Sequence, residues 1–163
     1  MADTSVTSKH AVQLLELCAS QNLTLAAAES CTGGGLAACI TGVPGSSHVF
    51  RGSIVAYSNE IKTSVLRVSP ETLAAHGAVS EATAREMSER ICSLMHSDIG
   101  IGITGIAGPD GGMPEKPVGL VYIAITVQGS TDVTQLHLIG DRQSIREQAV
   151  NASLDQCLRK IKG

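Results

Sequence analysis

The chain has 163 residues, of which 43% are hydrophobic but only 2% aromatic, and its formal net charge is −3. This length fits one domain of ordinary size. Nucleic-acid binding usually needs a basic surface and aromatic stacking platforms, which this composition lacks, so we exclude a polynucleotide partner. No apolar run is long enough to span a bilayer, and we therefore expect no membrane partner.

We predict the elements from the spacing of apolar residues. A serine before a periodic run indicates the start of a helix, as at Ser8, Ser69 and Ser80. In chain order we expect a helix over 8–21, a strand over 23–28, a helix that follows 29–35 and runs through Ile40, and a strand over 53–57. We then expect a short helix over 60–65, a helix starting at Ser69-Pro70 and a helix from Ser80 to about Met95. The last part of the chain should form a strand over 99–106, strands over 118–127 and 133–139 joined by the turn 128–132, and a helix over 142–161.

Helices and strands alternate along the whole chain, which is typical of an α/β fold. We predict a single three-layer α/β/α domain over residues 1–163, built on a mixed sheet. The polar residues 1–7 lack the apolar core of a signal peptide, and we expect them to form a flexible tail.

The cysteines are odd in number and widely spread, and none forms a C-x-x-C pair, so neither a zinc knuckle nor a disulfide framework is indicated. They are Cys18, Cys31, Cys39, Cys92 and Cys157. We therefore expect a reduced, cytoplasmic protein.

Three polar, glycine-rich segments each follow a predicted strand, where ligand sites of α/β sheets gather. They are residues 29–35, 57–62 and 104–112, and a fourth candidate is 44–47. The first segment places small hydroxyl residues and glycines at the start of a helix, where free backbone N–H groups suit a phosphate or a developing oxyanion. Alternatively, its glycines only let a helix pack closely on a strand. It matches neither a P-loop nor a dinucleotide-binding fingerprint.

A serine in the first segment needs a base before it can act as a nucleophile. None of the five histidines falls in a glycine-rich segment, and no G-x-S-x-G elbow is present. Lys62 follows a strand and a polar turn, and it can serve as a base if burial lowers its pKa; otherwise it is a solvated surface charge. Cys31 is a competing nucleophile, or else a small buried residue. No pattern of metal ligands is present.

Seven stretches together resemble, in the family's order, the C-terminal domain of the competence-damage-inducible (CinA) family, whose active members are nicotinamide mononucleotide deamidases of the PncC type. The stretches are AESCTGG at 28–34, VPGSS at 43–47, YSNEIK at 57–62, GAVSE at 77–81, TGIAGPDGG at 104–112, EKPVG at 115–119 and GDRQSIR at 140–146.

This resemblance implies hydrolysis of nicotinamide mononucleotide to nicotinic acid mononucleotide and ammonia through an acyl-enzyme, with neither a metal nor an organic cofactor. Ser30 would be the nucleophile and Lys62 its base, and backbone N–H groups near Cys31–Gly34 or at Ser47 would hold the oxyanion. One arginine would bind the phosphate with its guanidinium fork. The substrate-binding residues implied are Thr32, Gly33, Gly45, Ser47, Tyr57, Thr104, Gly105, Gly108, and Arg142 or Arg146.

The chain departs from the family pattern at a few positions. Ser53 and Arg67 replace expected glycines, Ala56 replaces a threonine, and Gly35 adds a third glycine to the first motif. Two alternatives therefore stay open: an inactive paralogue that binds a nicotinamide nucleotide, and an amidase for another small amide that acts through Cys31. Many family members carry a preceding pyrophosphatase domain, which this chain lacks, so we expect a stand-alone domain that assembles as a homo-oligomer.

Overall fold

A computed structural model of the chain describes residues 4–163. Its elements are α1 (Thr4–Ser20), β1 (Leu25–Glu29), α2 (Gly35–Thr41), the 3-10 turn η1 (Ser46–His48), β2 (Phe50–Val55), α3 (Asn59–Ser64), α4 (Pro70–His76), α5 (Glu81–Met95), β3 (Ile99–Gly105), β4 (Leu120–Val127), β5 (Ser130–His137) and α6 (Arg142–Lys162).

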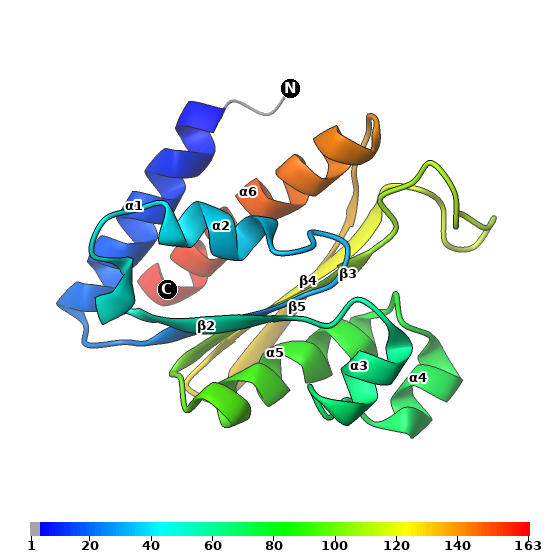
Figure 1. The fold of residues 1–163 in the computed structure, drawn as a ribbon, viewed down its shortest axis with the longest axis horizontal. Coiled ribbons are helices and arrows are strands. Elements are labelled where there is room, and N and C mark those ends of the chain that lie inside the picture. The colour runs from blue at the N-terminus through cyan, green and yellow to red at the C-terminus, as the bar shows by residue number, and fades with distance from the viewer. Residues whose placement is uncertain (1–3) are drawn as a thin grey trace.

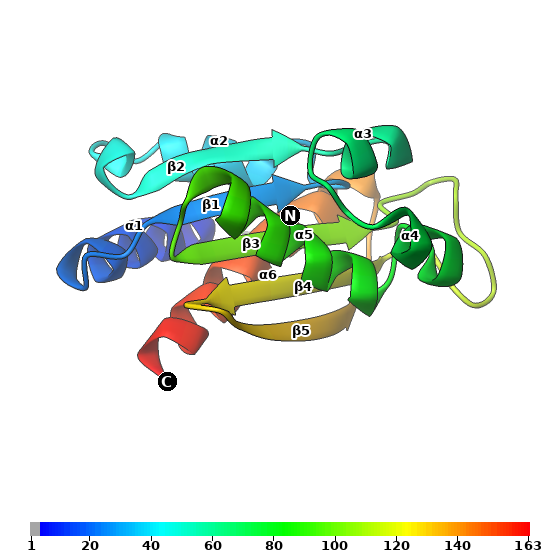
Figure 2. The same ribbon diagram turned by 90° about the horizontal axis from the view of Figure 1, so that it is seen from below.

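The five strands form one mixed sheet in the order β2-β1-β3-β4-β5 (Figure 2). Strands β2, β1 and β3 run parallel, whereas β4 and β5 are antiparallel to their neighbours. The carboxyl ends of the three parallel strands therefore meet at one edge of the sheet. The segments that leave this edge begin at Ser30, Ala56 and Ile106.

Helices cover both faces of the sheet, with α1, α2 and α6 on one face and α3, α4 and α5 on the other (Figure 1). The side chains of β1 alternate between the two cores, as expected for a strand buried on both faces. Leu25 and Ala27 pack in the core under α1 and α6, and Ala26 and Ala28 pack in the smaller core under α5. The predicted three-layer α/β/α architecture with a mixed sheet is confirmed.

Helix α5 lies directly on β3 because two glycines of that strand have no side chain. A Cβ atom at Gly100 would lie 2.2 Å from the carbonyl oxygen of Ser88, and one at Gly102 would lie 2.6 Å from that of Ala84. Both are shorter than real contacts, so β3 accepts only glycine at these positions without a shift of the helix.

Most element predictions agree with the structure, including the caps at Ser69 and Ser80, whose hydroxyls accept from the N–H groups of Thr72 and Thr83. One prediction at the N-terminus is wrong. Helix α1 begins at Thr4, so Ser8 lies inside the helix and residues 4–7 are helical instead of forming a flexible tail. Residues 1–3 of that predicted tail lie outside the described residues.

The β4–β5 hairpin is tighter than predicted. The turn contains only Gln128 and Gly129, which have φ values of 48° and 84°, and pairing resumes at once between Val127 and Ser130. Two residues with positive φ form the kind of turn that matches the twist of a hairpin, so β5 begins three residues before the predicted Val133. None of the helices within residues 4–163 has the length and apolar character needed to cross a membrane.

Candidate active site

The Lys62 amine and the Ser30 hydroxyl meet at the carboxyl edge of the parallel strands. Lys62 lies on α3, which starts behind its N-cap Ser58, and its Nζ atom is 2.9 Å from Ser30 Oγ. The same amine donates to the carbonyl of Ala56 at 2.8 Å. The lysine is only 1% exposed, and it forms no ion pair with any carboxylate of residues 4–163. Lys62 is therefore not a solvated surface charge.

Burial changes the acid–base character of this lysine. Loss of solvation lowers the pKa of the Lys62 amine from its ordinary 10.5, and the nearby Cys31 thiol opposes this shift only in part. A lower pKa increases the fraction of neutral amine near neutral pH. A neutral amine carries a lone pair, so it can accept the proton of a neighbouring hydroxyl.

Ser30 is held by the strands on both sides of β1. Its N–H donates to the carbonyl of Ile103 on β3 at 3.0 Å, and the carbonyl of the preceding residue, Glu29, accepts from Ala56 N–H at 2.8 Å. These bonds extend the parallel ladder one step beyond the end of β1. Because Ala56 also accepts from Lys62, the supports of the hydroxyl and of the amine are linked.

A fully buried carboxylate, that of Glu29, precedes the serine, and sequence reasoning missed it. One oxygen accepts from Thr32 Oγ1 at 2.7 Å and from the N–H groups of Gly34 and Leu36. The other accepts from Ala37 N–H at 2.9 Å and from Ser53 Oγ at 3.1 Å. The signal was a single acidic residue that ends an apolar strand and leads into a helix.

Glu29 corrects one expectation about the first glycine-rich segment. The N–H groups at the start of α2 are not free for a phosphate or an oxyanion, because those of Gly34, Leu36 and Ala37 already bind this carboxylate. The N–H group of Gly33 donates to the carbonyl of Ser30. Within the described residues, no backbone carbonyl accepts from the N–H groups of Cys31 and Thr32.

Arg146 lies across the turn that carries the serine. Its Nη2 donates to the carbonyl of Thr32 at 2.9 Å, and a Cβ at Gly33 would lie 3.3 Å from the same nitrogen. The Nε of Arg146 is buried and has no partner within residues 4–163. Thr32 itself is fully buried with its hydroxyl bound to Glu29, so this hydroxyl does not point to an open pocket.

Arg142 joins two of the predicted segments. Its guanidinium donates to the Tyr57 hydroxyl at 2.9 Å and to the carbonyl of Gly108 at 2.8 Å. Tyr57 is 59% exposed, so this edge faces solvent. The start of α6 and the segments after β2 and β3 therefore come together at the same edge as Ser30.

Two further predicted residues lie at the end of β3. Thr104 is buried, and its hydroxyl donates to the carbonyl of Ala78 at 2.7 Å. Gly105 packs so closely on β4 that a Cβ there would lie 2.7 Å from Val121. Both residues shape the edge of the site, but the Thr104 hydroxyl is already engaged.

The structure does not bring Gly45 and Ser47 to Ser30, and the prediction that they line the same pocket is wrong for a single chain. They belong to the η1 region, which enters β2, and the carbonyl of Val49 accepts from Leu25 N–H at the start of β1. Ser30 follows the other end of β1. Five residues of extended strand separate the two regions by roughly 16 Å, and Figure 1 shows them at opposite edges of the sheet.

A groove of about 970 Å³ runs between α1, α2 and α6 and starts at the two arginines. Thr32, Arg142 and Arg146 line one end, and Val43 and Pro44 line the other. Ser30 and Lys62 are buried and are not part of its lining, but Thr32, which is two residues after Ser30, is. The arginines therefore lie at the border between the groove and the serine.

The competing nucleophile is in an unfavourable state. Burial raises the pKa of the Cys31 thiol to about 11, although its own backbone N–H, Lys62 and Arg146 act in the opposite direction. The residue is 6% exposed. Across the described part of the chain, no three His, Cys, Asp or Glu side chains cluster in a way that could hold a metal ion.

The fold and the site thus define a three-layer α/β domain with a buried serine–lysine pair at the carboxyl edge of its parallel strands. The chain belongs to the CinA C-terminal domain family, whose sequence profile it matches over residues 7–161.

Comparisons with individual proteins agree with this assignment. The chain is 51% identical over 149 residues to a CinA-like protein of Gemmatimonas aurantiaca, covering 91% of this chain and 35% of that protein. It is 52% identical over 148 residues to a CinA-like protein of Kosmotoga olearia, covering 91% and 36%. The chain thus spans about a third of the length of these curated relatives.

Solved structures show the same fold. The crystal structure of competence damage-inducible protein A from Klebsiella pneumoniae matches with a TM-score of 0.93 and 35% identity, covering 96% of this chain and 97% of that one. The competence/damage inducible protein from Agrobacterium tumefaciens matches with a TM-score of 0.93 and 34% identity, covering 97% and 96%.

Proposed function

We propose that this domain hydrolyses the carboxamide of nicotinamide mononucleotide to nicotinic acid mononucleotide and ammonia, with Ser30 as nucleophile and Lys62 as base. The observation that carries the proposal is the 2.9 Å contact between Ser30 Oγ and the buried amine of Lys62. Burial is what a lysine needs to act as a base near neutral pH. We choose the substrate from the resemblance to the CinA family, whose active members are nicotinamide mononucleotide deamidases.

The chemistry proceeds in two halves. Ser30 Oγ attacks the carboxamide carbon while its proton passes to Lys62 Nζ, and the carbonyl becomes an oxyanion. When the tetrahedral intermediate collapses, the C–N bond breaks and the lysine returns the proton to the departing ammonia. A water molecule then attacks the acyl-enzyme while Lys62 accepts one of its protons. When this second intermediate collapses, the bond between the acyl carbon and Ser30 Oγ breaks and Lys62 returns that proton to the serine. The acid product gives its remaining proton to the released ammonia and leaves as a carboxylate.

The oxyanion needs donors that are not already used. No backbone carbonyl accepts from the N–H groups of Cys31 and Thr32, and the amide that follows a nucleophile is a common oxyanion donor. We assign this role to them in place of the start of α2 and of Ser47. One such donor elsewhere contributes roughly 10²–10³ in rate.

The direct test is release of ammonia from nicotinamide mononucleotide by the wild-type chain and by Ser30→Ala and Lys62→Met. We expect Ser30→Ala to abolish turnover and Lys62→Met to lower kcat by about 10²–10⁴, the range for loss of a general base. Thr126→Val serves as the control, because it also removes a buried hydrogen-bonding group but lies on β4 away from the site. Undiminished turnover in either dyad variant would remove the mechanism.

The phosphate is expected to bind at Arg142 or Arg146, which border the groove. Loss of a charge-assisted hydrogen bond should raise KM by about 10- to 100-fold. We predict that one of the two variants, Arg142→Gln or Arg146→Gln, shows this increase in KM for the mononucleotide. The same variant should show a smaller increase in KM for the riboside, which lacks the phosphate. Steady-state kinetics on both substrates identify the arginine. Equal effects on the two substrates would assign that arginine a structural role.

Two alternatives differ in outcome. A non-catalytic member would bind the mononucleotide in calorimetry without forming product, and an amidase of different specificity would release ammonia from another small amide. A screen of nicotinamide, its riboside, its mononucleotide and the dinucleotide separates these cases. The free state of all five cysteines agrees with a cytoplasmic location, which we also propose.

A further inference from the structure

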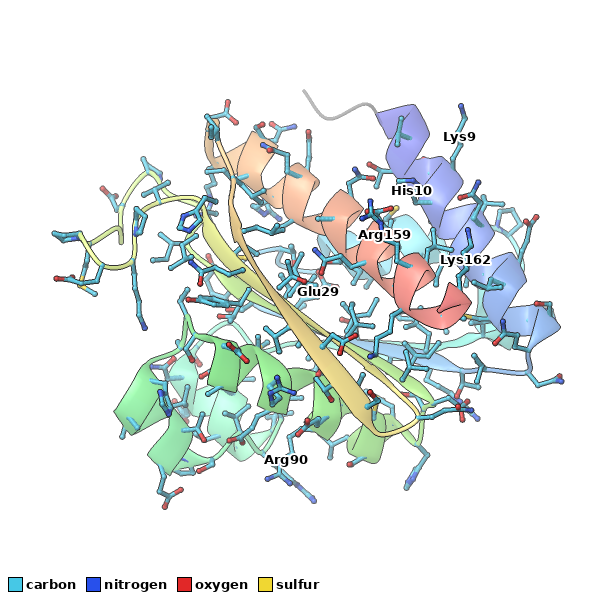
Figure 3. All side chains as sticks on the ribbon, turned by 180° about the vertical axis from the view of Figure 1, so that it is seen from behind. Lys9, His10, Glu29, Arg90, Arg159 and Lys162 are labelled. Carbon is cyan, nitrogen blue, oxygen red and sulfur yellow. The ribbon has the colours of Figure 1, made fainter. Side chains whose placement is uncertain are left out.

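The Glu29 side chain is a buried carboxylate that no cation neutralises within residues 4–163. Figure 3 shows it in the interior of the molecule, whereas the labelled Lys9 and Arg90 project from the surface. Burial of a carboxylate is costly unless hydrogen bonds replace its water. Five donors do so here, and three of them are backbone N–H groups at the positive end of α2.

These contacts leave Glu29 no proton-transfer role. Both oxygens are occupied by donors, and Ser30 Oγ is not among them. The serine hydroxyl has its partner in Lys62 instead. The carboxylate therefore acts through the backbone that it holds.

That backbone is the turn of residues 30–34, which we call the nucleophile turn. Glu29 stands at its beginning, and its carboxylate binds Thr32 in the middle and Gly34 at the end at 2.7 Å and 3.2 Å. The main chain of Glu29 bonds to Ala56, which supports Lys62. A single residue thus fixes the turn and connects it to the support of the base.

We infer that Glu29 is a positioning residue: its carboxylate holds the nucleophile turn so that Ser30 Oγ stays in reach of Lys62 and the N–H groups of Cys31 and Thr32 stay free. This inference rests on the proposed function only in taking Ser30 as the nucleophile. A misplacement of about 1 Å can lower a reaction rate on the order of 10²-fold. Loss of the Glu29 carboxylate should therefore lower the reactivity of Ser30 and leave substrate affinity unchanged.

The test measures Ser30 reactivity without the substrate. Phenylmethylsulfonyl fluoride forms a sulfonyl ester with a reactive serine; Oγ bonds to sulfur, fluoride leaves, and the proton passes to the lysine. We expect Glu29→Gln to be labelled at Ser30 about 10- to 100-fold more slowly than wild type, by mass spectrometry of the peptide. With nicotinamide mononucleotide, kcat should fall by a similar factor while KM stays within about twofold.

A milder pair of variants guards against misfolding of Glu29→Gln. Thr32→Val removes only the hydroxyl that ties Glu29 to the turn, and Thr32→Ser keeps it. We expect slower labelling with valine and recovery with serine. Thr126→Val is the matched control, since it also removes a buried threonine hydroxyl, which bonds to Ser88 and Thr131 on the far part of the sheet. Its labelling rate should equal that of wild type.

The outcomes separate this inference from the proposed substrate. If wild type is labelled at Ser30 and the variants more slowly, but the mononucleotide is not hydrolysed, the substrate proposal fails and the positioning role stands. If folded Glu29→Gln, or Thr32→Val should the former not fold, is labelled as fast as wild type, the positioning role is overturned. Absence of labelling at Ser30 in the wild-type chain would overturn it as well.

Discussion

Lys62 is 1% exposed, and a lysine buried to this extent must either pair with an anion or have a lowered pKa. Lys62 has no carboxylate partner among the residues that the structure describes, and loss of solvation lowers the pKa of its amine. Its hydrogen bonds go to a carbonyl and to a hydroxyl. The environment of this one side chain is therefore what turns an ordinary serine into a candidate nucleophile.

Cys31 is adjacent to the nucleophile, and its pKa of about 11 leaves the thiol protonated at neutral pH. A protonated, buried thiol is a poor nucleophile. We predict that Cys31→Ala retains turnover within about threefold of wild type, whereas Ser30→Ala abolishes it. The measurement is ammonia release at pH 7.5, repeated after treatment with iodoacetamide. Loss of activity in Cys31→Ala alone would favour the cysteine-dependent alternative.

The residues of the site differ in how far the sequence could reveal them. Ser30 and Lys62 follow strands in polar segments, so their positions were predictable from pattern and resemblance. The burial of Lys62 and the five bonds of Glu29 depend on three strands and α2 meeting in space. The spacing of residues along the chain does not predict these tertiary contacts.

At the level of elements, α5 packs so closely on β3 that the strand has glycine where the helix crosses it. A Cβ at Gly102 would lie 2.6 Å and 2.7 Å from backbone atoms of Ala84 and Ser88, which cannot move aside as a flexible side chain can. We predict that Gly102→Ala lowers the free energy of unfolding by about 1–3 kcal/mol, the usual effect of overpacking. Urea denaturation checks this value.

The control for this prediction is Gly42→Ala at the end of α2, where the backbone is already right-handed with φ −65°. It should change stability by less than about 0.5 kcal/mol. Equal effects at the two positions would show that the contact between α5 and β3 does not limit the size of residue 102.

The bounds of an element were predictable where local sequence signals mark them. They were not predictable where pairing with a neighbouring strand sets the end of a strand. Ser80 and the apolar stripe predicted a helix from Ser80 to about Met95, and α5 spans Glu81–Met95 with Ser80 as its N-cap. Strand β2, in contrast, begins at Phe50 instead of the predicted Ser53, because it pairs with Leu25 at its start. The same pairing carries Gly45 and Ser47 to the far edge of the sheet, a location that motif order alone does not reveal.

Over the whole molecule, the buried lysine couples stability to pH. The amine has a lower pKa in the folded chain than its ordinary 10.5, so between these two values the unfolded chain binds more protons. Stability then rises with pH in that interval, by about 1.4 kcal/mol per pH unit at most, and this contribution is flat below the folded pKa.

We therefore predict that wild type gains stability relative to Lys62→Met as the pH rises toward 10.5. The difference between the two proteins is the quantity to follow, by urea denaturation at successive pH values. Buried thiols with raised pKa values, such as Cys18 and Cys157, act in the opposite direction but are common to both proteins. A difference that does not vary with pH would mean that Lys62 titrates alike in the folded and unfolded chains.

The tight turn at Gln128 and Gly129 has a practical use. Because β4 runs antiparallel to β3, this turn lies beside Ile99, at the end of the sheet away from Ser30. A Cβ at Gly129 would meet no atom within 4 Å, so there is open space around the chain here. A fluorophore or a short affinity peptide inserted between these two residues would report on the protein from the edge opposite the chemistry and leave the serine and lysine undisturbed.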